Sequence, residues 1–399
     1  MSLIVFLWIA FAVNYVDRQM VFSIYPALTR DLGFTAPQLG LIGSVFQWVY
    51  TLSMPVAGRF ADIWRRDWMI LASLVLWSAA TIGCGLSGSV PGFLVWRAVM
   101  GITEALYYPA AVALIAGVYS DAARSKALGL HQSAQLAGVV AGGWYGGWTA
   151  DRIGWRDGFA YAGLAGIAYT FVLAFALRGA RSSQASDRGR TRGSARQLLG
   201  SRCYIALAGA FLAFCAMLWI FYAWFPAFLY DRYRLSMTES GWNATLFIQA
   251  SCGLGVVVGG FLADRMSRRW PAARFIVLAA GILFSAPFAY LTFAADSLAL
   301  ARLFSACFGA FAGLTIANVF AAAFDVVAAG NRGVGAGILN MTGGISSAAM
   351  IYLAGLWQHS VGLAALMLWV VAAAMLAACI LIATVNARFE PERHAMARG

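Results

Sequence analysis

Long apolar runs separated by short polar or charged stretches dominate this 399-residue sequence. Each run is long enough to cross about 30 Å of hydrocarbon as an α-helix, which satisfies its own backbone hydrogen bonds. A transmembrane β-barrel would instead require strict alternation over segments of about ten residues. The pattern predicts an all-α integral membrane protein with twelve transmembrane helices, near residues 2–28, 38–58, 68–88, 91–118, 126–149, 157–178, 203–230, 241–263, 275–294, 298–324, 333–357 and 361–386.

A stretch rich in Gly, Ser and Arg divides the chain near its middle. Residues 179–202 have almost no apolar content, which is typical of a flexible linker. The loop after the second predicted helix of each half also repeats, since Gly58 to Asp62 corresponds to Gly260 to Asp264. Duplication on this scale indicates a two-bundle transporter. We therefore predict two pseudo-symmetric six-helix bundles, a linker and a tail, at residues 1–178, 203–386, 179–202 and 387–399 respectively.

Composition and charge agree with the membrane interpretation. The chain is 62% hydrophobic and only 11% charged, whereas soluble domains are about 25% charged. Most basic residues fall in loops on one side, so the positive-inside rule predicts a multi-pass protein of the inner (plasma) membrane with both termini cytoplasmic. The net charge of +12 then reflects topology and anionic lipid, not nucleic acid. We expect a monomer in the lipid bilayer.

The sequence lacks the usual signatures of an enzyme. All six cysteines lie within or beside apolar segments, and no pair has the spacing of a metal site. There is also no glycine-rich nucleotide loop. We therefore predict no enzymatic activity, no metal and no cofactor, with a proton as the coupling ion.

Four charged residues interrupt the apolar runs: Asp17, Arg18, Arg97 and Glu104. A charge at the centre of a membrane costs about 2.5–3.5 kcal/mol on insertion scales, so such residues usually face a wet cavity or a partner. Burial disfavours the charged form of a carboxylate, which suits Asp17 and Glu104 to proton coupling. A permanent structural pairing of either carboxylate with an arginine is the alternative.

The two arginines are expected to have different roles. The planar guanidinium of Arg18 matches a carboxylate, so we predict that it binds the substrate anion. Arg97 is expected to form a switchable salt bridge with Asp17, and Asn14 to orient its helix neighbours. Polar or aromatic residues at helix midpoints complete the predicted substrate site, although each could equally serve helix packing. They are Tyr15, Gln135, Tyr222, Trp224, Gln249 and Asn340.

Two features of residues 126–149 are interpreted as packing. His131 is expected to be a buried structural histidine. Glycines at spacings of about four form a stripe that lets helices approach closely, and these are Gly138, Gly142, Gly143, Gly146 and Gly147.

The repeated loop resembles the signature G-x-x-x-D-x-x-R-R of the major facilitator superfamily. The resemblance implies a major facilitator fold in which these loops close the cytoplasmic side. Anchoring of the topology by positive charge is the alternative. The corresponding residues are Gly58, Asp62, Arg65, Arg66, Asp264, Arg268 and Arg269.

A narrower resemblance covers most of the chain. The run from Asn14 to Gln19 is similar to the N-Y-x-D-R motif of the anion:cation symporter group, and Arg97-x3-Gly101-x2-Glu104 is similar to its helix 4. Spinster-like transporters share both motifs. Gly154-Trp155-Arg156 is similar to the loop before helix 6 of the anion group, and the matches that favour this group are Trp224-Phe225-Pro226 and Asn340-x2-Gly343.

These observations predict a proton-coupled symporter that moves a small organic anion, such as a sugar acid or another carboxylate, by alternating access. A spinster-like transporter of lysolipids or other amphipaths is the first alternative. A membrane sensor that transports nothing is the second.

Overall fold

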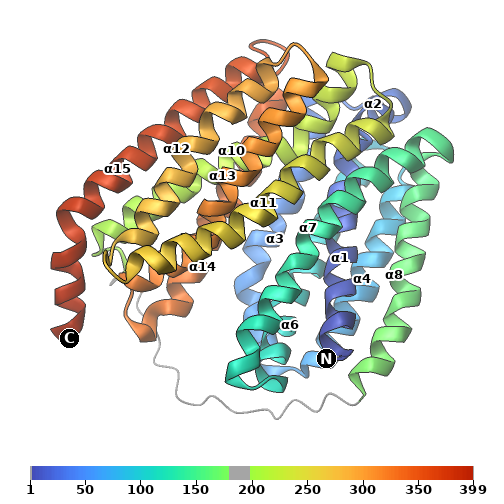
Figure 1. Ribbon diagram of the computed structural model, residues 1–399. Helices are drawn as coiled ribbons and strands as arrows, with labels where there is room; N and C mark the ends of the chain where they lie inside the picture. Colours follow the sequence, from blue (N-terminus) through green and yellow to red (C-terminus); the bar gives the residue numbers. More distant parts are fainter. Residues whose placement is uncertain (1, 179–197, 399) are drawn as a thin grey trace. The chain divides into compact units, whose positions relative to one another are not determined.

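The computed structural model describes residues 2–178 and 198–398, which are helical apart from short connections (Figure 1). The helices up to residue 178 are α1 (Ser2–Ser23), α2 (Tyr25–Leu32), α3 (Ala36–Ile63), α4 (Arg66–Leu86), α5 (Val90–Ala105), α6 (Tyr107–Val118), α7 (Asp121–Arg152) and α8 (Trp155–Leu177). Those after residue 197 are α10 (Arg202–Tyr233), α11 (Met237–Ser267), α12 (Ala273–Ala294), α13 (Leu298–Asp325), the short η1 (Ala329–Asn331), α14 (Arg332–Trp357) and α15 (Leu363–Arg398). The all-α prediction is confirmed.

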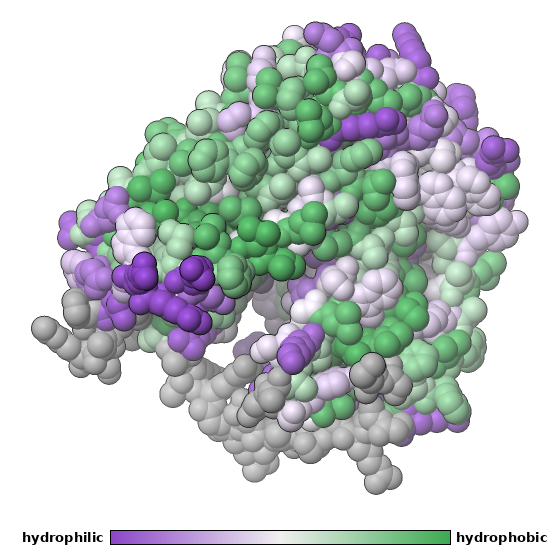
Figure 2. Space-filling view, in the orientation of Figure 1, coloured by the Kyte–Doolittle hydropathy of each residue, from purple (hydrophilic) through white to green (hydrophobic). Residues whose placement is uncertain are grey.

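In the described ranges, eleven helical spans are long and apolar enough to cross a membrane. The predicted segment 126–149 corresponds to α7, which is not one of the eleven because its glycines and polar residues lower its mean hydropathy. Figure 2 shows hydrophobic residues across the middle of one face, over α11 and α12, and hydrophilic residues mainly toward helix ends. This distribution is the one that a multi-pass membrane protein requires.

Packing groups the chain into two compact units. The first contains everything up to the end of α8 together with Tyr222–Thr245 and Ile351–Leu356, and the second contains the rest of the described chain. The predicted linker lies largely outside the described residues. The predicted boundaries of the two bundles stay predictions, and α15 continues beyond residue 386 to Arg398 without interruption.

Two predicted helices are in fact broken, each beside a proline. The first predicted span, 2–28, divides at Ile24 into α1 and α2, with Pro26 in the first turn of α2. The predicted span 91–118 divides at Leu106 into α5 and α6, and Pro109 lacks the N–H that would bond the carbonyl of Ala105. The second break, at Leu106, comes two residues after Glu104. The helix is therefore interrupted beside a buried carboxylate.

Glycines on α7 bring its backbone against α1, as the glycine stripe predicts. A Cβ atom on Gly138 would lie 2.5 Å from the carbonyl oxygen of Ala12, and one on Gly142 would lie 2.7 Å from that of Val16. Gly146 meets the carbonyl of Met20 even more closely. The two helices run side by side in Figure 1, so α7 supports the polar part of α1.

An ionic and aromatic cluster joins α2 to the start of α8. Trp155 Nε1 donates to Asp31 Oδ2 at 2.9 Å, and Arg30 Nε donates to Asp31 Oδ1 at 2.9 Å. These partners lower the pKa of the Asp31 carboxyl, with the hydrogen bond from Arg30 as the largest cause. The preceding Gly154 has a φ of 97°, which side-chain-bearing residues rarely adopt. The Gly154-Trp155-Arg156 motif is thus explained by the backbone conformation at Gly154 and by the contacts of Trp155 and Arg156 with Asp31.

Candidate functional site

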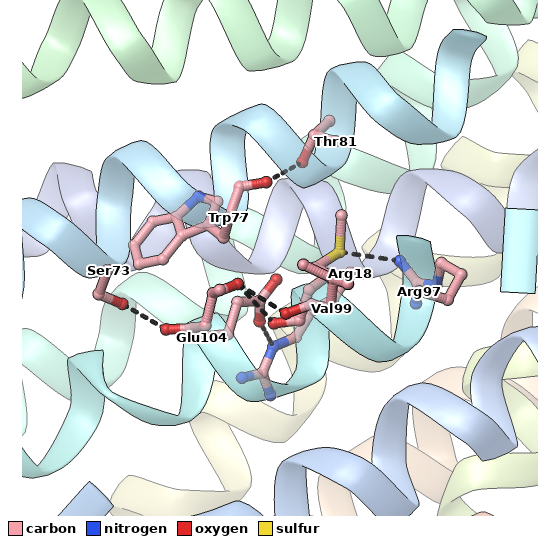
Figure 3. Close-up of polar contacts among 9 residues, drawn as sticks. Arg18, Ser73, Trp77, Thr81, Arg97, Val99 and Glu104 are labelled. Atoms are coloured by element: carbon pink, nitrogen blue, oxygen red, sulfur yellow. Dashed lines mark hydrogen bonds and ion pairs between the residues drawn. The ribbon is translucent and has the colours of Figure 1, made fainter. Parts of the chain in front are cut away.

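A buried ion pair between α1 and α5 forms the centre of the site. Arg18 Nε donates to Glu104 Oε2 at 2.5 Å, and the side chains are 8% and 0% exposed. Figure 3 shows the guanidinium directed at the carboxylate. The other oxygen, Glu104 Oε1, has no hydrogen-bond partner in the described part of the chain. The arginine assigned to substrate and the carboxylate assigned to protons are therefore in direct contact.

Aromatic rings surround the Arg18 guanidinium. Its Cζ atom lies 4.2 Å from the ring centroid of Tyr50 and 5.0 Å from those of Tyr15 and Phe46. A cation over an aromatic face within about 6 Å is attracted by the negative potential of the ring. Tyr15 and Tyr50 are only partly buried, so this part of the site is not sealed on every side.

Asp17 points in a different direction from Arg18, because consecutive helical side chains diverge by about 100°. It is 1% exposed, and neither carboxylate oxygen has a hydrogen-bond partner among the residues the structure describes. Its surroundings on α4 include Trp77 and Thr81. The indole N–H of Trp77 is likewise unpartnered, while Thr81 Oγ1 donates to the Trp77 carbonyl at 3.0 Å. Asp17 is thus a buried acid without the contacts that normally stabilise a charge.

Arg97 is fully buried on α5 and is held by neutral groups. Its Nε donates to the carbonyl of Ile42 at 3.4 Å, and its Nη1 contacts Met100 Sδ at 3.1 Å. No carboxylate oxygen lies within 4 Å in the described ranges, so the expected ion pair with Asp17 is not formed in this structure. Arg97 still belongs to the electrostatic environment of Asp17 and Glu104.

The remaining predicted site residues fall into different parts of the fold. Asn14 is buried near Glu104, although its amide atoms reach no hydrogen-bonding geometry within the described chain. Gln135 on α7 is partly buried. In the first unit, the Trp224 indole donates to the carbonyl of Ile351 at 3.0 Å, and the carbonyl of Tyr222 accepts from Gln19 at 3.1 Å. These contacts show helix packing at Tyr222 and Trp224.

Gln249 and Asn340 belong to the second unit. Gln249 is 2% exposed, and both of its amide atoms are unpartnered within the described chain. Asn340 is exposed. Their assignment to the substrate site stays a prediction.

The two copies of the repeated loop make different contacts. Asp62 is exposed, and Arg66 donates to the carbonyl of Ala113 at 3.1 Å. In the second copy, Arg274 bonds both Asp264, at 3.2 Å, and Asp325, at 2.8 Å. Arg65 pairs with its near neighbour Asp67 at 2.6 Å. Gly58 lies in the last two turns of α3, and Arg268 and Arg269 directly follow the end of α11. The closing role of these loops stays a prediction.

Sequence reasoning missed Phe46 and Tyr50, which line the site from α3. Two aromatic residues four positions apart in an apolar helix look like ordinary core, and only their contact with Arg18 reveals them. No group of three potential metal ligands occurs among the described His, Cys, Asp and Glu residues.

This chain resembles known families and proteins over most of its length. The model of the Major Facilitator Superfamily matches residues 7–351. A "Probable sulfoacetate transporter SauU" from Cupriavidus necator is 26% identical over 367 residues, covering 84% of this chain and 81% of the relative. The D-galactonate transporter of Escherichia coli is 23% identical and covers 94% and 93%. Protein spinster of Drosophila melanogaster is 25% identical, over 69% of this chain and 47% of that protein.

Solved structures support the fold. A bacterial homolog of the human lysosomal transporter Spinster, in an inward-facing and occupied conformation, superimposes with a TM-score of 0.79. The match covers 100% of this chain and 96% of that chain at 18% identity. At this identity the likeness is one of fold, and it agrees with the resemblance seen in the sequence.

Proposed function

The chain belongs to the Major Facilitator Superfamily and is a membrane transport protein, and on that premise we propose that it is a proton-coupled symporter of a small organic anion. The observation that carries the proposal is the buried Arg18–Glu104 ion pair beside the unpartnered Asp17. The proposed anion-binding group thus contacts one group that can hold a proton, Glu104, and is next in sequence to a second, Asp17.

Arg18 couples the substrate to the proton because its guanidinium serves two anions in turn. While Glu104 is ionised, it occupies the guanidinium edge that a substrate carboxylate would use. A proton on Glu104 removes this competitor and frees Arg18 for the substrate. Linkage is reciprocal, so a bound substrate anion also favours the protonated form of Glu104.

Asp17 is the second proposed proton carrier. An ionised carboxylate with no hydrogen bond is costly to bury, so a proton at this position lets the site close without an isolated negative charge. Arg97 lies in the same electrostatic environment and can compensate the ionised form of Asp17 after the proton leaves. Movement of Arg97 between neutral groups and Asp17 would constitute the proposed switch.

The names of the relatives suggest the substrate class. Sulfoacetate, galactarate, D-glucarate and D-galactonate, which appear in those names, are small and carry at least one carboxylate or sulfonate. Such a group is a planar or compact oxyanion that a guanidinium recognises well. From the charge distribution of its loops we propose an inner-membrane protein with both termini cytoplasmic. We also propose that it acts as a monomer.

The spinster likeness motivates the second candidate, a lysolipid or another amphipath. Thermal unfolding of the purified protein with D-galactonate, D-glucarate, sulfoacetate or a lysolipid tests the choice, because a ligand that binds the folded form raises the melting temperature. We expect stabilisation by at least one small anion, and its loss in Arg18→Ala. Stabilisation by the lysolipid alone, retained in Arg18→Ala, would instead support the amphipath transporter.

A further inference from the structure

Phe46 contacts both buried arginines. Its ring centroid lies 5.0 Å from Arg18 Cζ and 4.7 Å from Arg97 Cζ. Both guanidiniums are thus over the same ring, so they lie within about 10 Å of each other. Two positive groups at this separation in a poorly solvated site repel each other, whereas the aromatic face attracts each of them.

The position of the Phe46 ring is fixed by its surroundings. The side chain is 2% exposed and stacks on Tyr50, with centroids 5.8 Å apart and planes at 18°. The backbone is fixed as well, because a Cβ atom on Gly101 of α5 would lie only 2.8 Å from the Phe46 carbonyl oxygen. Gly101 follows Arg97 by one helical turn, so the helix that carries one arginine packs directly on the ring's own helix.

Together the two arginines balance the two buried carboxylates. Arg18 pairs directly with Glu104, and Arg97 belongs to the electrostatic environment of both Asp17 and Glu104. When a carboxylate takes up a proton, its arginine loses a negative neighbour and keeps its positive charge. The aromatic face then contributes a larger fraction of the interaction energy that stabilises that guanidinium.

We propose that Phe46 is a positioning residue that holds both guanidiniums and thereby couples the proton occupancy of Glu104 to that of Asp17. This inference rests on the proposed function, in which both carboxylates carry protons. Phe46 lines the site, but its ring has no group that takes up or releases a proton. It acts through the arginines, and a single ring links the anion-binding end of the site to the Asp17 end.

Other groups facing the two arginines belong to the same electrostatic system. Tyr15 on α1 and Tyr50 on α3 interact with Arg18. Glu104 on α5, Cys84 on α4 and Tyr25 on α2 interact with Arg97. The carboxylates of Asp17 and Glu104 also interact directly with each other. Fluorination of the Phe46 ring leaves these groups unchanged, so an effect that depends on the electrons of the ring can be assigned to that ring.

The test replaces Phe46 by phenylalanines that carry one, two or three ring fluorines, which weaken the negative face with little change of shape. The pH dependence of anion uptake into vesicles is measured for each. The ring contributes more to the stability of each arginine when its carboxylate is neutral. Fluorination therefore destabilises the protonated state more than the ionised state, so the midpoint of the pH dependence of uptake should move to lower pH with each fluorine. Across the series we expect a shift of about half a pH unit to one unit.

Phe93 provides the matched control. It is fully buried on α5 and contacts the rings of Phe34, Trp155 and Phe159. Fluorination of Phe93 should leave the midpoint unchanged. If both series shift alike, or if the Phe46 series does not shift, Phe46 only fills space and the inference is wrong. The uptake midpoint of Phe46→Leu should resemble that of the most fluorinated variant. Phe46→Trp keeps an aromatic face and should keep the wild-type midpoint.

A second measurement separates this inference from the proposed function. Infrared absorption of protonated carboxyl groups follows Asp17 and Glu104 without any transport, and Asp17→Asn and Glu104→Gln identify their bands. The inference predicts that fluorination of Phe46 moves the titration of both bands. If wild-type uptake does not depend on pH but the bands still shift, only the transport proposal fails. If uptake is proton-driven but neither band shifts, only the inference fails.

Discussion

In the proposed function, the Arg18 guanidinium serves two competing anions, Glu104 and the substrate. The bond to Glu104 is short and buried, and the aromatic rings of Tyr15, Tyr50 and Phe46 leave the cation few other positions. A lysine would keep the charge but would lose the planar, forked geometry. An arginine-to-lysine change therefore tests the geometry of the donor separately from its positive charge.

We expect Arg18→Lys to weaken binding of a small carboxylate by about ten- to a hundredfold, which corresponds to the roughly 1.5–3 kcal/mol of a charge-assisted hydrogen bond. Arg18→Ala should be at least as damaging, because the anion then enters an uncompensated site. Equilibrium binding of a radiolabelled sugar acid measures both. Affinity close to wild type in Arg18→Lys would remove Arg18 from the substrate site and leave Arg97 as the next candidate.

The carboxylates should matter for accumulation more than for exchange. Asp17→Asn and Glu104→Gln should each abolish substrate accumulation driven by a pH gradient, because neither amide can carry a proton. At least one variant should retain counterflow exchange, which requires no net proton movement. Uptake into vesicles with and without a gradient measures the two activities. Wild-type accumulation in both variants would rule out the proposed proton role.

The sequence reveals the charged residues of the site because charge stands out in an apolar segment. Asp17, Arg18, Arg97 and Glu104 were recognisable for that reason. Their pairing was not, since the Arg18–Glu104 contact joins two residues that are 86 positions apart in the chain. The expected Asp17–Arg97 bond is absent from the described contacts, because Arg97 is satisfied in part by the Ile42 carbonyl and Met100. No sequence signal distinguished Phe46 and Tyr50 from the other apolar residues of α3.

Helix contacts and helix breaks determine where these side chains lie. Glycines let α7 support α1, and the interruption at Leu106 ends α5 just after Glu104. The glycine stripe was predictable from its spacing, because small residues at helical repeats have a general packing role. The breaks were not predicted, although Pro26 and Pro109 provided a signal, because the apolar pattern continues across both.

The α1–α7 contact should not tolerate a single added methyl group at its tightest point. Gly146→Ala places a Cβ against the Met20 carbonyl, and overpacking of this kind typically costs about 1–3 kcal/mol. Gly129→Ala on the same helix is the matched control, since a Cβ there would meet nothing within 4 Å. We expect a lower melting temperature for the first variant and an equal or higher one for the second. Equal melting temperatures would show that α7 can shift away from α1.

The repeated loops provide the other test at the level of elements. If they close the inner side, Asp62→Ala or Asp264→Ala should raise the rate at which a cysteine placed at Gln135 is labelled from that side. Asp157→Ala, an exposed change at the start of α8, should leave the rate unchanged. Unchanged labelling in both loop variants would reduce these residues to anchors of the topology.

At the scale of the whole molecule, the all-helical membrane class and the superfamily were both readable from the sequence. Hydrophobic length predicts spans without any tertiary information, and the repeated loop adds the family resemblance. The matched superfamily model and the relatives named as transporters agree with that reading. Substrate specificity could not be predicted in the same way, because it depends on a few side chains from several helices. The pattern of residues along the chain does not specify which of these side chains lie together in the fold.

The central claim is that anion and proton move together. Purified protein in vesicles that contain a pH-sensitive dye tests it most directly, with no pH gradient imposed. Addition of D-galactonate, D-glucarate or sulfoacetate outside should acidify the interior for the anion that is transported, and Arg18→Ala vesicles should show no change. Entry of the same labelled anion without any internal acidification would contradict proton-coupled symport.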